Sequence, residues 1–478
     1  MASSLESEIA EQRRWRLRPA FQKLTVFDSL VRNEFLSSQQ HGAMESALLQ
    51  PVIAFAVARV PFYRELFARL GLRAADIASA ADLVKLPLLS KIDLVRQGRR
   101  LQAEQLPQGE KIFGPFLSSG TTGRPAKVLH THRSNSMFTF LGQRQIRWLR
   151  WDPMARTAEI RLPSQLPGLA EGRQVDVGET CRRDGWRYMG SFFETGPYCG
   201  FSVFNPVEAQ VEWLRHEQPT YLTGYSETLE QLALAARGGK CPTSLRGLRA
   251  ISEQLTEGMR RRIAGVFGAP VAQNYGLNEI GLVAGMCEAG RYHVHSEHCI
   301  VEIVDQDGKP CAPGQSGRIV VTALKNLAMP LLRYDTDDVA EVPEGPCPCG
   351  RILPSFGKVV GRYSRIAYLP EGTLGYVGAL RTVLEEMPEE LLHDLRQFQV
   401  HQFRDGRFEL RLRTTATLPP EVGTRVDAAW RAATGGRDLP LKIVEVDEIA
   451  RPPGGKYQDF TSDFMPAMGS AEEPEPEN

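Results

Sequence analysis

The sequence predicts an α/β protein built from two unequal domains. At 478 residues, the chain exceeds the size at which a single hydrophobic core stops growing. From about residue 112 onward, short apolar runs alternate with amphipathic stretches, which is typical of strands and helices in an α/β fold. After Gly361 and Arg362 the pattern changes to helix, hairpin, helix and strand. We therefore expect a large N-terminal domain over residues 1–361 and a small C-terminal domain over residues 362–465.

The two ends of the chain differ in character. Residues 5–40 and 41–72 carry apolar residues at helical spacing, and Gly71 is placed to end the second helix. These helices should form a cap on the large domain. Residues 466–478 are small, acidic and proline-containing, so they cannot bury enough apolar surface to order themselves. We expect them to form a disordered tail.

The elements between these ends alternate in type. Helices are expected at Val207–His216, Glu227–Ala236 and Glu257–Phe267. Strands are expected at Ile112–Leu117, Leu245–Ile251, Pro270–Asn274, Cys299–Val304 and Arg318–Thr322, and the last two should pair. In the small domain, apolar alternation around Asp405 and Gly406 predicts a hairpin, and a third strand follows it. The strands of this domain are expected at Phe398–Phe403, Phe408–Arg413 and Leu441–Val446.

The charge balance and the absence of long apolar runs limit the kinds of molecule that the protein is expected to bind. The 57 basic and 57 acidic residues cancel, so no global field attracts nucleic acid or an anionic membrane. No run of about 18 apolar residues occurs, and the N-terminus lacks an apolar signal segment. We expect small-molecule partners, no nucleic acid, no membrane, a cytoplasmic location, and a monomer or homodimer. The eight cysteines are then free thiols, because a reducing compartment prevents disulfides.

A glycine- and hydroxyl-rich loop carries the strongest chemical signal. Residues 117–128 read LSSGTTGRPAKV, in which glycines allow close backbone approach and hydroxyl groups stand beside backbone N–H donors. This pattern indicates an anion cradle for nucleotide phosphates, although an ordinary Ser/Thr/Gly turn is the simpler alternative. The GxxxxGK[ST] pattern of P-loop proteins is not met, because Gly123 is followed by Arg124, Pro125 and Ala126.

Three further segments follow the loop in a recognisable order. They read YGLNE at residues 275–279, RYDTDD at 333–338 and GGKY at 454–457. With the loop and the segment VPFYR at 60–64, they resemble the motifs of the adenylate-forming enzymes, the superfamily of acyl-CoA synthetases, adenylation domains and luciferases. The resemblance is greatest to the phenylacetate-CoA ligase-like branch, and it spans most of the chain. It implies activation of a small-molecule carboxylic acid by ATP, with release of pyrophosphate and transfer to CoA.

The resemblance also implies roles for individual residues. Lys456 would bridge the acid and the α-phosphate, and Glu279 would hold Mg²⁺ against the departing phosphates. Tyr275 would lie against adenine, and Asp338 would accept hydrogen bonds from the ribose. Gly276 would belong to the nucleotide site and, with Leu277, would line the acyl pocket. Glu253 matches its motif more loosely and would lie at the edge of the adenine site. Arg362 would assist near the hinge between the domains. The phosphates would be held by Ser119, Gly120, Thr121, Thr122 and Gly123, of which Thr122 would be catalytic.

The acid and its acceptor are less well defined by the sequence. Aromatic residues between the loop and Tyr275 favour a flat aromatic or aryl-alkyl acid, although each could equally be a core residue. These aromatics are Phe192, Phe193, Tyr198, Tyr221 and Tyr225. Asp337 replaces a family glycine, and the hinge aspartate after Arg362 is absent. The acceptor could therefore be an amine or a carrier-protein thiol instead of CoA, or the chain could be a non-catalytic nucleotide-binding partner protein.

Four soft ligands indicate a structural zinc site. Cys287 precedes His293 across a turn at Gly290, and Cys347 and Cys349 form a C-x-C pair. Two such pairs can supply the tetrahedral sulfur and nitrogen ligands that Zn²⁺ prefers. Some phenylacetate-CoA ligase-like proteins have a similar arrangement. His295, His298 or Cys299 could replace His293 as a ligand, and buried cysteines beside a solvated histidine cluster are the alternative without metal.

Overall fold

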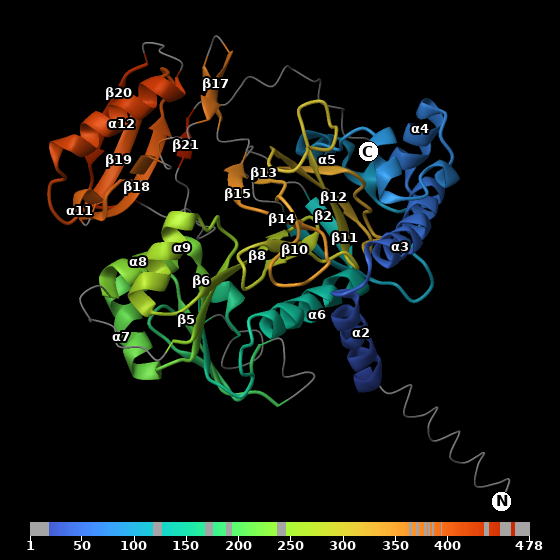
Figure 1. Ribbon diagram of the computed structural model, residues 1–478, viewed down its shortest axis with the longest axis horizontal. Coiled ribbons are helices and arrows are strands. Elements are labelled where there is room, and N and C mark those ends of the chain that lie inside the picture. Colours follow the sequence, from blue (N-terminus) through green and yellow to red (C-terminus); the bar gives the residue numbers. More distant parts are fainter. Residues whose placement is uncertain are drawn as a thin grey trace, which may run out of the picture. The chain divides into compact units, whose positions relative to one another are not determined.

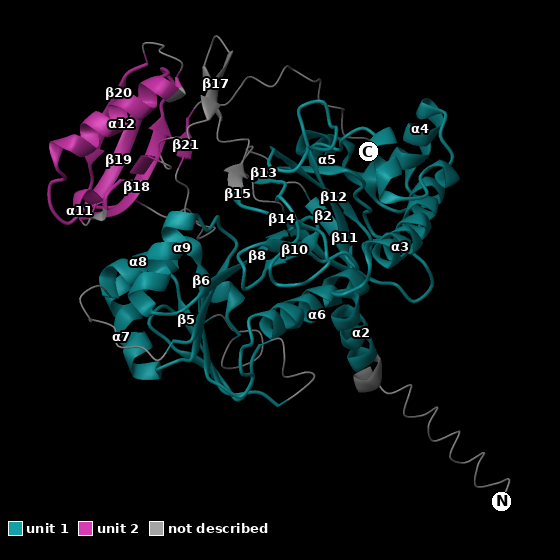
Figure 2. Cartoon of the chain, viewed as in Figure 1, with its two compact units in different colours: residues 1–360 teal, residues 361–478 magenta. Residues whose placement is uncertain are grey.

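The computed structural model divides the chain into two compact units, Met1–Val360 and Gly361–Asn478 (Figure 2). This division lies one residue before the expected boundary. The structure describes residues 19–117, 127–167, 175–187, 194–236 and 245–360 of the first unit, and 361–362, 366–369, 372–376, 380, 383–384, 387–392, 394–434, 439–449 and 460–463 of the second. The expected tail, 466–478, lies outside the described residues.

The described N-terminal part is helical but more broken than the sequence predicts. In place of two long helices it forms α2 (Pro19–Asn33), α3 (Ser38–Arg59) and α4 (Pro61–Leu70) (Figure 1). A capping box at Ser37 starts α3, and Pro61 starts α4 because proline fits the first helical turn but not a helix interior. Gly71 ends α4 in a left-handed conformation, as predicted. Among the described residues no single helix is long and apolar enough to cross a membrane, although α3 and α4, bent by 99°, pass that test together.

A nine-stranded mixed sheet forms the centre of the first unit. Its strand order is β14-β10-β9-β8-β7-β6-β3-β5-β4, and the five strands from β8 to β5 are parallel. The strands are β3 (Thr157–Arg161), β4 (Cys181–Arg183), β5 (Tyr198–Ser202), β6 (Tyr221–Tyr225), β7 (Gly247–Ile251), β8 (Val271–Leu277), β9 (Gly281–Met286), β10 (Tyr292–Val294) and β14 (Ser355–Phe356). Strand β8 runs three residues past the predicted end, so Tyr275, Gly276 and Leu277 lie in the strand, while Asn278 and Glu279 lie in the turn that follows it.

Helices cover this sheet and create its cores. The helices α7 (Val207–Glu217), α8 (Ser226–Ala236) and α9 (Glu257–Phe267) pack with β3, β6 and β7 in one apolar cluster (Figure 1). Helix α6 (His132–Trp148) packs on β9. The two elements are in close contact, since a Cβ added at Gly285 in β9 would lie 3.0 Å from the Trp148 ring. The three predicted helices in this region are confirmed. Because these helices cover the faces of the sheet, we expect the functional site at the ends of its strands.

Two smaller sheets bring other motifs to the centre. Strands β1 (Ile112–Leu117) and β2 (Lys127–Thr131) pair antiparallel, with Leu117 opposite Lys127. Strands β11 (Cys299–Val304), β12 (Ser316–Ala323), β13 (Tyr334–Glu341) and β15 (Val359–Arg362) form a four-stranded sheet. The predicted pairing of β11 with β12 is confirmed.

The second unit is an α+β fold. It contains the strand pair β16 (Ile366–Leu369) and β17 (Gly372–Tyr376), and a sheet ordered β20-β19-β18-β21. Strands β18 (Leu395–Gln402) and β19 (Phe408–Thr414) form the predicted hairpin, in which Gly406 has a positive φ of 83°. Strands β20 (Leu441–Glu445) and β21 (Phe460–Ser462) flank it, and α12 (Pro420–Ala433) packs on it through a core that includes Val426 and Trp430. The short helix α11 spans Glu389–Leu392.

Candidate functional site

Tyr275 and Asp338 meet between two sheets. Tyr275 lies in β8 and Asp338 in β13, and the tyrosine hydroxyl donates a hydrogen bond of 2.8 Å to Asp338 Oδ2. Thr336 contacts both residues. Its Oγ1 lies 3.3 Å from the tyrosine hydroxyl and accepts a hydrogen bond from the backbone N–H of Asp338. The same hydroxyl donates to the carbonyl of Ile319. Two residues expected to contact adenosine are therefore brought into direct contact.

The aspartate at the family glycine position adopts the conformation that the glycine would provide. Asp337 has φ 62°, which lies in the left-handed region favoured by glycine and tolerated by aspartate. Its backbone N–H donates to Asp335 Oδ1 at 3.1 Å, and Asp335 is held by Arg318 at 2.5 Å. The replacement therefore keeps the turn that presents Asp338.

Glu279 lies in the tight turn between β8 and β9. Only 6% of its surface is exposed, and the Tyr334 hydroxyl donates to Glu279 Oε1 at 3.2 Å. Burial raises the pKa of Tyr334, so this hydroxyl stays protonated and acts as a donor. Gly276 faces the returning strand, where an added Cβ would lie 2.8 Å from the Gly281 carbonyl oxygen. The turn thus requires glycine at 276 and directs Glu279 inward.

Glu253 lies after β7, at the carboxyl ends of the parallel strands. Its Oε2 accepts from the backbone N–H of Glu227 at 3.1 Å, in the first turn of α8. Its carbonyl accepts from Ser226 Oγ and from Gln273 Nε2. Ligands of open α/β sheets bind at this edge. The described contacts of Glu253 fix the start of α8 there.

The remaining nucleotide residues are not described in the structure. Ser119, Gly120, Thr121, Thr122, Gly123 and Lys456 lie outside the described residues, and Arg362 ends β15 without a described side chain. The strands on either side of the loop are described. Leu117 ends β1 and its carbonyl accepts from Asn278 Nδ2 at 2.8 Å, which ties the loop's base to the Glu279 turn.

The aromatic residues expected around the acid separate into different places. Tyr221 begins β6, where it stacks on Trp151 with ring centroids 4.3 Å apart. Tyr198 begins β5 and donates to the buried Glu159 carboxylate. Tyr225 ends β6 at the carboxyl edge and donates to Gln165 Oε1 at 2.6 Å. Phe192 and Phe193 lie outside the described residues.

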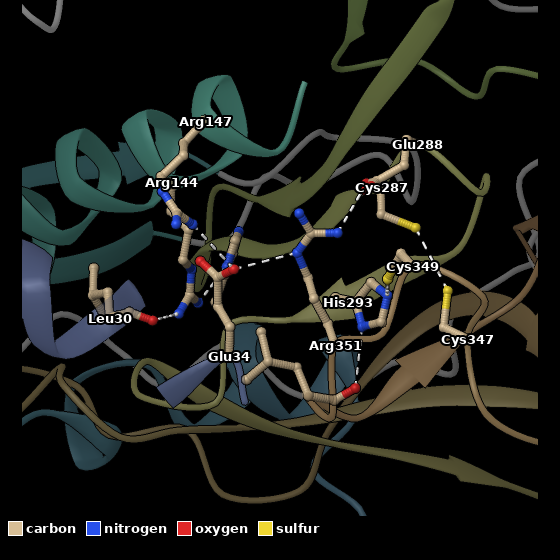
Figure 3. A network of polar contacts seen from close by, with 12 residues as sticks. Leu30, Glu34, Arg144, Arg147, Cys287, Glu288, His293, Cys347, Cys349 and Arg351 are labelled. Atoms are coloured by element: carbon tan, nitrogen blue, oxygen red, sulfur yellow. Dashed lines mark hydrogen bonds and ion pairs between the residues drawn. The ribbon is translucent and has the colours of Figure 1, made fainter. Parts of the chain in front are cut away.

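The structure brings the four predicted zinc ligands together. One ligand atom from each of Cys287, His293, Cys347 and Cys349 lies within 4.8 Å of the other three. The sulfur atoms of Cys287 and Cys347 are 3.7 Å apart, and Cys349 Sγ is 3.2 Å from His293 Nε2 (Figure 3). A tetrahedral zinc ion with bonds of about 2.3 Å to sulfur requires sulfur atoms about 3.8 Å apart. The donor set and its spacing therefore fit zinc.

Contacts around the cluster orient its ligands. The Leu353 carbonyl lies 3.1 Å from His293 Nδ1, which places the proton on Nδ1 and leaves Nε2 as the lone-pair donor. Burial lowers the pKa of His293 to about 4, so the ring is neutral. Burial would raise the pKa of Cys349, but hydrogen bonds from Arg351 outweigh it and lower that pKa. The environment thus favours the metal-binding protonation states of His293 and Cys349, whereas burial raises the pKa of the Cys287 and Cys347 thiols.

The alternative ligands are engaged elsewhere. His295 Nδ1 lies 2.8 Å from the Arg144 guanidinium, and His298 Nε2 lies 2.8 Å from the Ile280 carbonyl oxygen. Cys299 is fully buried against the Val283 carbonyl. Of the candidate ligands named from the sequence, Cys287, His293, Cys347 and Cys349 are therefore the four that converge.

An ion network that the sequence did not predict joins this cluster to α2. Arg351 lies 3.3 Å from Glu34 Oε2 and 2.8 Å from Glu288 Oε2 (Figure 3). Its guanidinium covers the Trp148 ring at 4.9 Å. Glu34 follows α2, has no exposed surface and also faces Arg147 at 3.5 Å. The nearby Arg144, also fully buried, bonds both oxygens of Glu297 and the Leu30 carbonyl. No local pattern marks these pairs, because their partners lie far apart in sequence.

Known proteins share both the sequence pattern and the fold. Residues 193–328 match the family model described as AMP-binding enzyme. The phenylacetate-coenzyme A ligase of Thermus thermophilus is 27% identical over 406 residues, covering 82% of this chain and 86% of its own length. The Escherichia coli enzyme of the same name is 26% identical over 391 residues, covering 79% and 82%. A structure of 2-hydroxyisobutyryl-CoA ligase in its postadenylation state superposes with a TM-score of 0.69 at 18% identity, covering 90% and 91% of the two chains.

The fold is thus that of the adenylate-forming CoA ligases. Within that class, the sequence is similar to the phenylacetate-CoA ligases, and the resemblance predicted from four short motifs is confirmed.

Proposed function

We propose that the protein activates a carboxylic acid with ATP, releases pyrophosphate to form an acyl-adenylate, and transfers the acyl group to CoA. The observation that carries this proposal is a pair of hydrogen bonds to β13: Tyr275 of β8 bonds Asp338 in this strand, and Tyr334 at its start bonds Glu279 in the turn after β8. It is supported by the phenylacetate-CoA ligases to which the chain is similar over most of its length. We propose an aromatic or aryl-alkyl acid, as in those relatives.

Each residue would bind the part of the substrates that its charge and hydrogen-bonding groups fit. The carboxylate of Asp338 would accept hydrogen bonds from the ribose hydroxyls, while the Tyr275 ring would lie against the adenine. The loop from Ser119 to Gly123 would hold the departing phosphates through backbone N–H and hydroxyl donors. The buried carboxylate of Glu279 fits a divalent cation, and Mg²⁺ held there would neutralise the phosphate charge. Lys456 would bridge the attacking carboxylate and the α-phosphate.

The test is acid-dependent release of pyrophosphate. We expect release with ATP, Mg²⁺ and acids from an aromatic and aliphatic panel, and formation of the thioester only when CoA is added. Lys456→Ala should lower the rate by about 10²–10³-fold, because a charge-assisted contact to the reacting oxygens is lost. Lys442→Ala, at an exposed position on β20 of the same unit, is the matched control. Release without thioester would assign another acceptor, and absence of release with every acid would refute the proposal.

We also propose that the Cys/His cluster, consisting of Cys287, His293, Cys347 and Cys349, holds a structural Zn²⁺. Four protein ligands leave no open position for a substrate, which is typical of structural zinc sites. The described cysteines are all free thiols, as expected in the cytoplasm, where we propose that the protein resides. Elemental analysis should find one zinc per chain, and folded protein without metal would refute this part of the proposal.

A further inference from the structure

Two buried histidines flank the turn that carries Glu279. His130 comes from β2, and its Nε2 lies 2.9 Å from the carbonyl oxygen of Asn278, the residue before Glu279. His298 comes from the segment before β11, and its Nε2 lies 2.8 Å from the carbonyl oxygen of Ile280, the residue after Glu279. The two rings reach the turn from segments that are far apart in sequence.

Both histidines are neutral donors. A carbonyl oxygen only accepts hydrogen bonds, so each Nε2 must carry the proton. His130 is 5% exposed and His298 is 2% exposed. Burial lowers the pKa of His298 to about 4 and also lowers that of His130, so neither ring is charged at neutral pH. Each ring therefore holds a peptide group of the turn without adding a positive charge beside Glu279.

Several further contacts restrict the conformation of the turn that carries Glu279. The Ile280 N–H donates to the Leu277 carbonyl at 3.2 Å, and Gly281 takes a positive φ of 101°. An added Cβ at Gly281 would lie 3.2 Å from His298 Nε2, so the histidine packs directly against the turn. The Tyr334 hydroxyl holds one carboxylate oxygen of Glu279. The backbone on both sides and the side chain of Glu279 are thus fixed by groups from three other elements.

Asn278 connects this turn to the phosphate-loop hairpin. Its side-chain amide donates to the carbonyl of Leu117, the last residue of β1, while its own carbonyl accepts from His130 in β2. The loop expected to hold phosphates runs between these two strands. A shift of the turn would therefore move Glu279 relative to the base of that loop.

We propose that His130 and His298 are positioning residues that hold the Glu279 carboxylate where it can share a divalent cation with the phosphates of ATP. The inference rests on the proposed function, in which Glu279 holds Mg²⁺. Neither histidine touches the cation or the reacting atoms. Their contribution is to fix the Glu279 turn relative to β1 and β2, the strands at the base of the phosphate loop, because the position of a carboxylate determines how tightly a small octahedral ion binds.

The experiment measures how ATP binding depends on Mg²⁺. Calorimetric ATP titrations of the full chain over a range of MgCl₂ give the Mg²⁺ concentration at which the affinity gain is half complete. We expect His130→Phe and His298→Phe, which keep a ring but lose the donor, each to raise this concentration about 10-fold. His130→Gln and His298→Gln restore an N–H donor and should recover most of the loss.

The matched control is His41→Phe. His41 is another buried histidine of the first unit, but it faces Glu45 on α3 at 3.7 Å and contacts no part of the turn. We expect it to leave the Mg²⁺ dependence unchanged, whatever it does to the melting temperature. Phe variants of His130 and His298 that shift the Mg²⁺ dependence no more than His41→Phe would overturn the inference.

Failure of the two proposals can be told apart. If no acid supports pyrophosphate release but the Phe variants still shift the Mg²⁺ dependence of ATP binding, the proposed reaction fails and the positioning role stands. If release is normal in the wild type and the Phe variants keep the wild-type Mg²⁺ dependence, the positioning role fails alone.

Discussion

The nucleotide region and the Cys/His cluster lie on one ladder of strands but use their polar groups in opposite ways. Tyr275 in β8 pairs with Ala284 in β9, and Cys287 directly follows β9. At the first position, tyrosine, threonine and carboxylate groups from two sheets hold each other by single hydrogen bonds. At the second, four ligands converge, and Arg351 bonds both Cys349 and the fully buried Glu34.

The difference teaches what each region is suited to hold. Single hydrogen bonds between groups that can also accept from a ligand are suited to a nucleotide that enters and leaves at every turnover. Four converging soft ligands with a fixed histidine tautomer are suited to an ion that stays. Changes to the cluster should therefore alter stability first, whereas changes to the nucleotide region should alter affinity first.

The largest effect is expected from the cluster itself. Cys347→Ser should release the zinc and lower the free energy of unfolding by on the order of 5 kcal/mol, because metal binding is coupled to folding. Chelation of the wild type should have the same effect. Denaturant unfolding with elemental analysis measures both. Cys311→Ser, at a partly exposed thiol outside the cluster, is the control. Equal stability of the two variants would remove the distinction between the regions.

The second test asks whether the cluster and α2 form one unit. Arg351→Met would leave the buried Glu34 carboxylate with Arg147 as its remaining described ionic partner, and should destabilise the fold by about 3 kcal/mol. Hydrogen exchange of amides in α2 should speed up. Arg291→Met is the matched control, because its partly exposed side chain bonds carbonyls of the neighbouring loop and not Glu34 in the structure. Unchanged exchange in α2 would show that the cap is held by other contacts.

The third test uses pH to probe a partly buried carboxylate in the same cap. Burial raises the pKa of Glu45 in α3 from 4.5 to about 7. Between these pH values the folded state retains a proton that the unfolded state has lost, so stability falls as pH rises from about 4.5 to 7. Glu45→Gln should remove this loss and gain about 2 kcal/mol at pH 8 relative to pH 4. Denaturant unfolding at both pH values checks it, and equal slopes with pH for wild type and variant would contradict it.

The smallest effect belongs to the nucleotide region. Tyr275→Phe keeps the ring but removes the hydroxyl that donates to Asp338, so ATP affinity should fall about 3- to 10-fold. The melting temperature should change little. Calorimetric ATP titration and thermal unfolding measure the two quantities. A large loss of stability with unchanged affinity would reverse the comparison between the regions.

The sequence could predict elements whose signals are local. Glu257–Phe267 was recognisable from its apolar spacing, and the hairpin around Gly406 from alternation and a turn glycine. The four cysteine and histidine ligands were recognisable from their residue types. The break between α3 and α4 was missed, although Pro61 at the first helical position carried the signal.

Long-range polar contacts could not be predicted in this way. Glu34 and Arg351 are more than 300 positions apart, and nothing in their neighbourhoods marks them as partners. The contacts of His130 and His298 with the Glu279 turn depend on three sheets that meet only in the folded chain. Asp337 shows the reverse case, since its residue type looked disruptive while its backbone takes the required left-handed turn.

The position of Glu34 limits how far the chain can be shortened. Glu34 is the acceptor for Arg351 and also bonds the backbone N–H of Ile352 through its carbonyl, while Leu30 receives Arg144. Deletion of the residues before Pro19 leaves these contacts in place. Deletion through Glu34 would expose apolar surface and remove one partner each from Arg144 and Arg351, so shortened forms made for crystallisation or fusion should begin before α2.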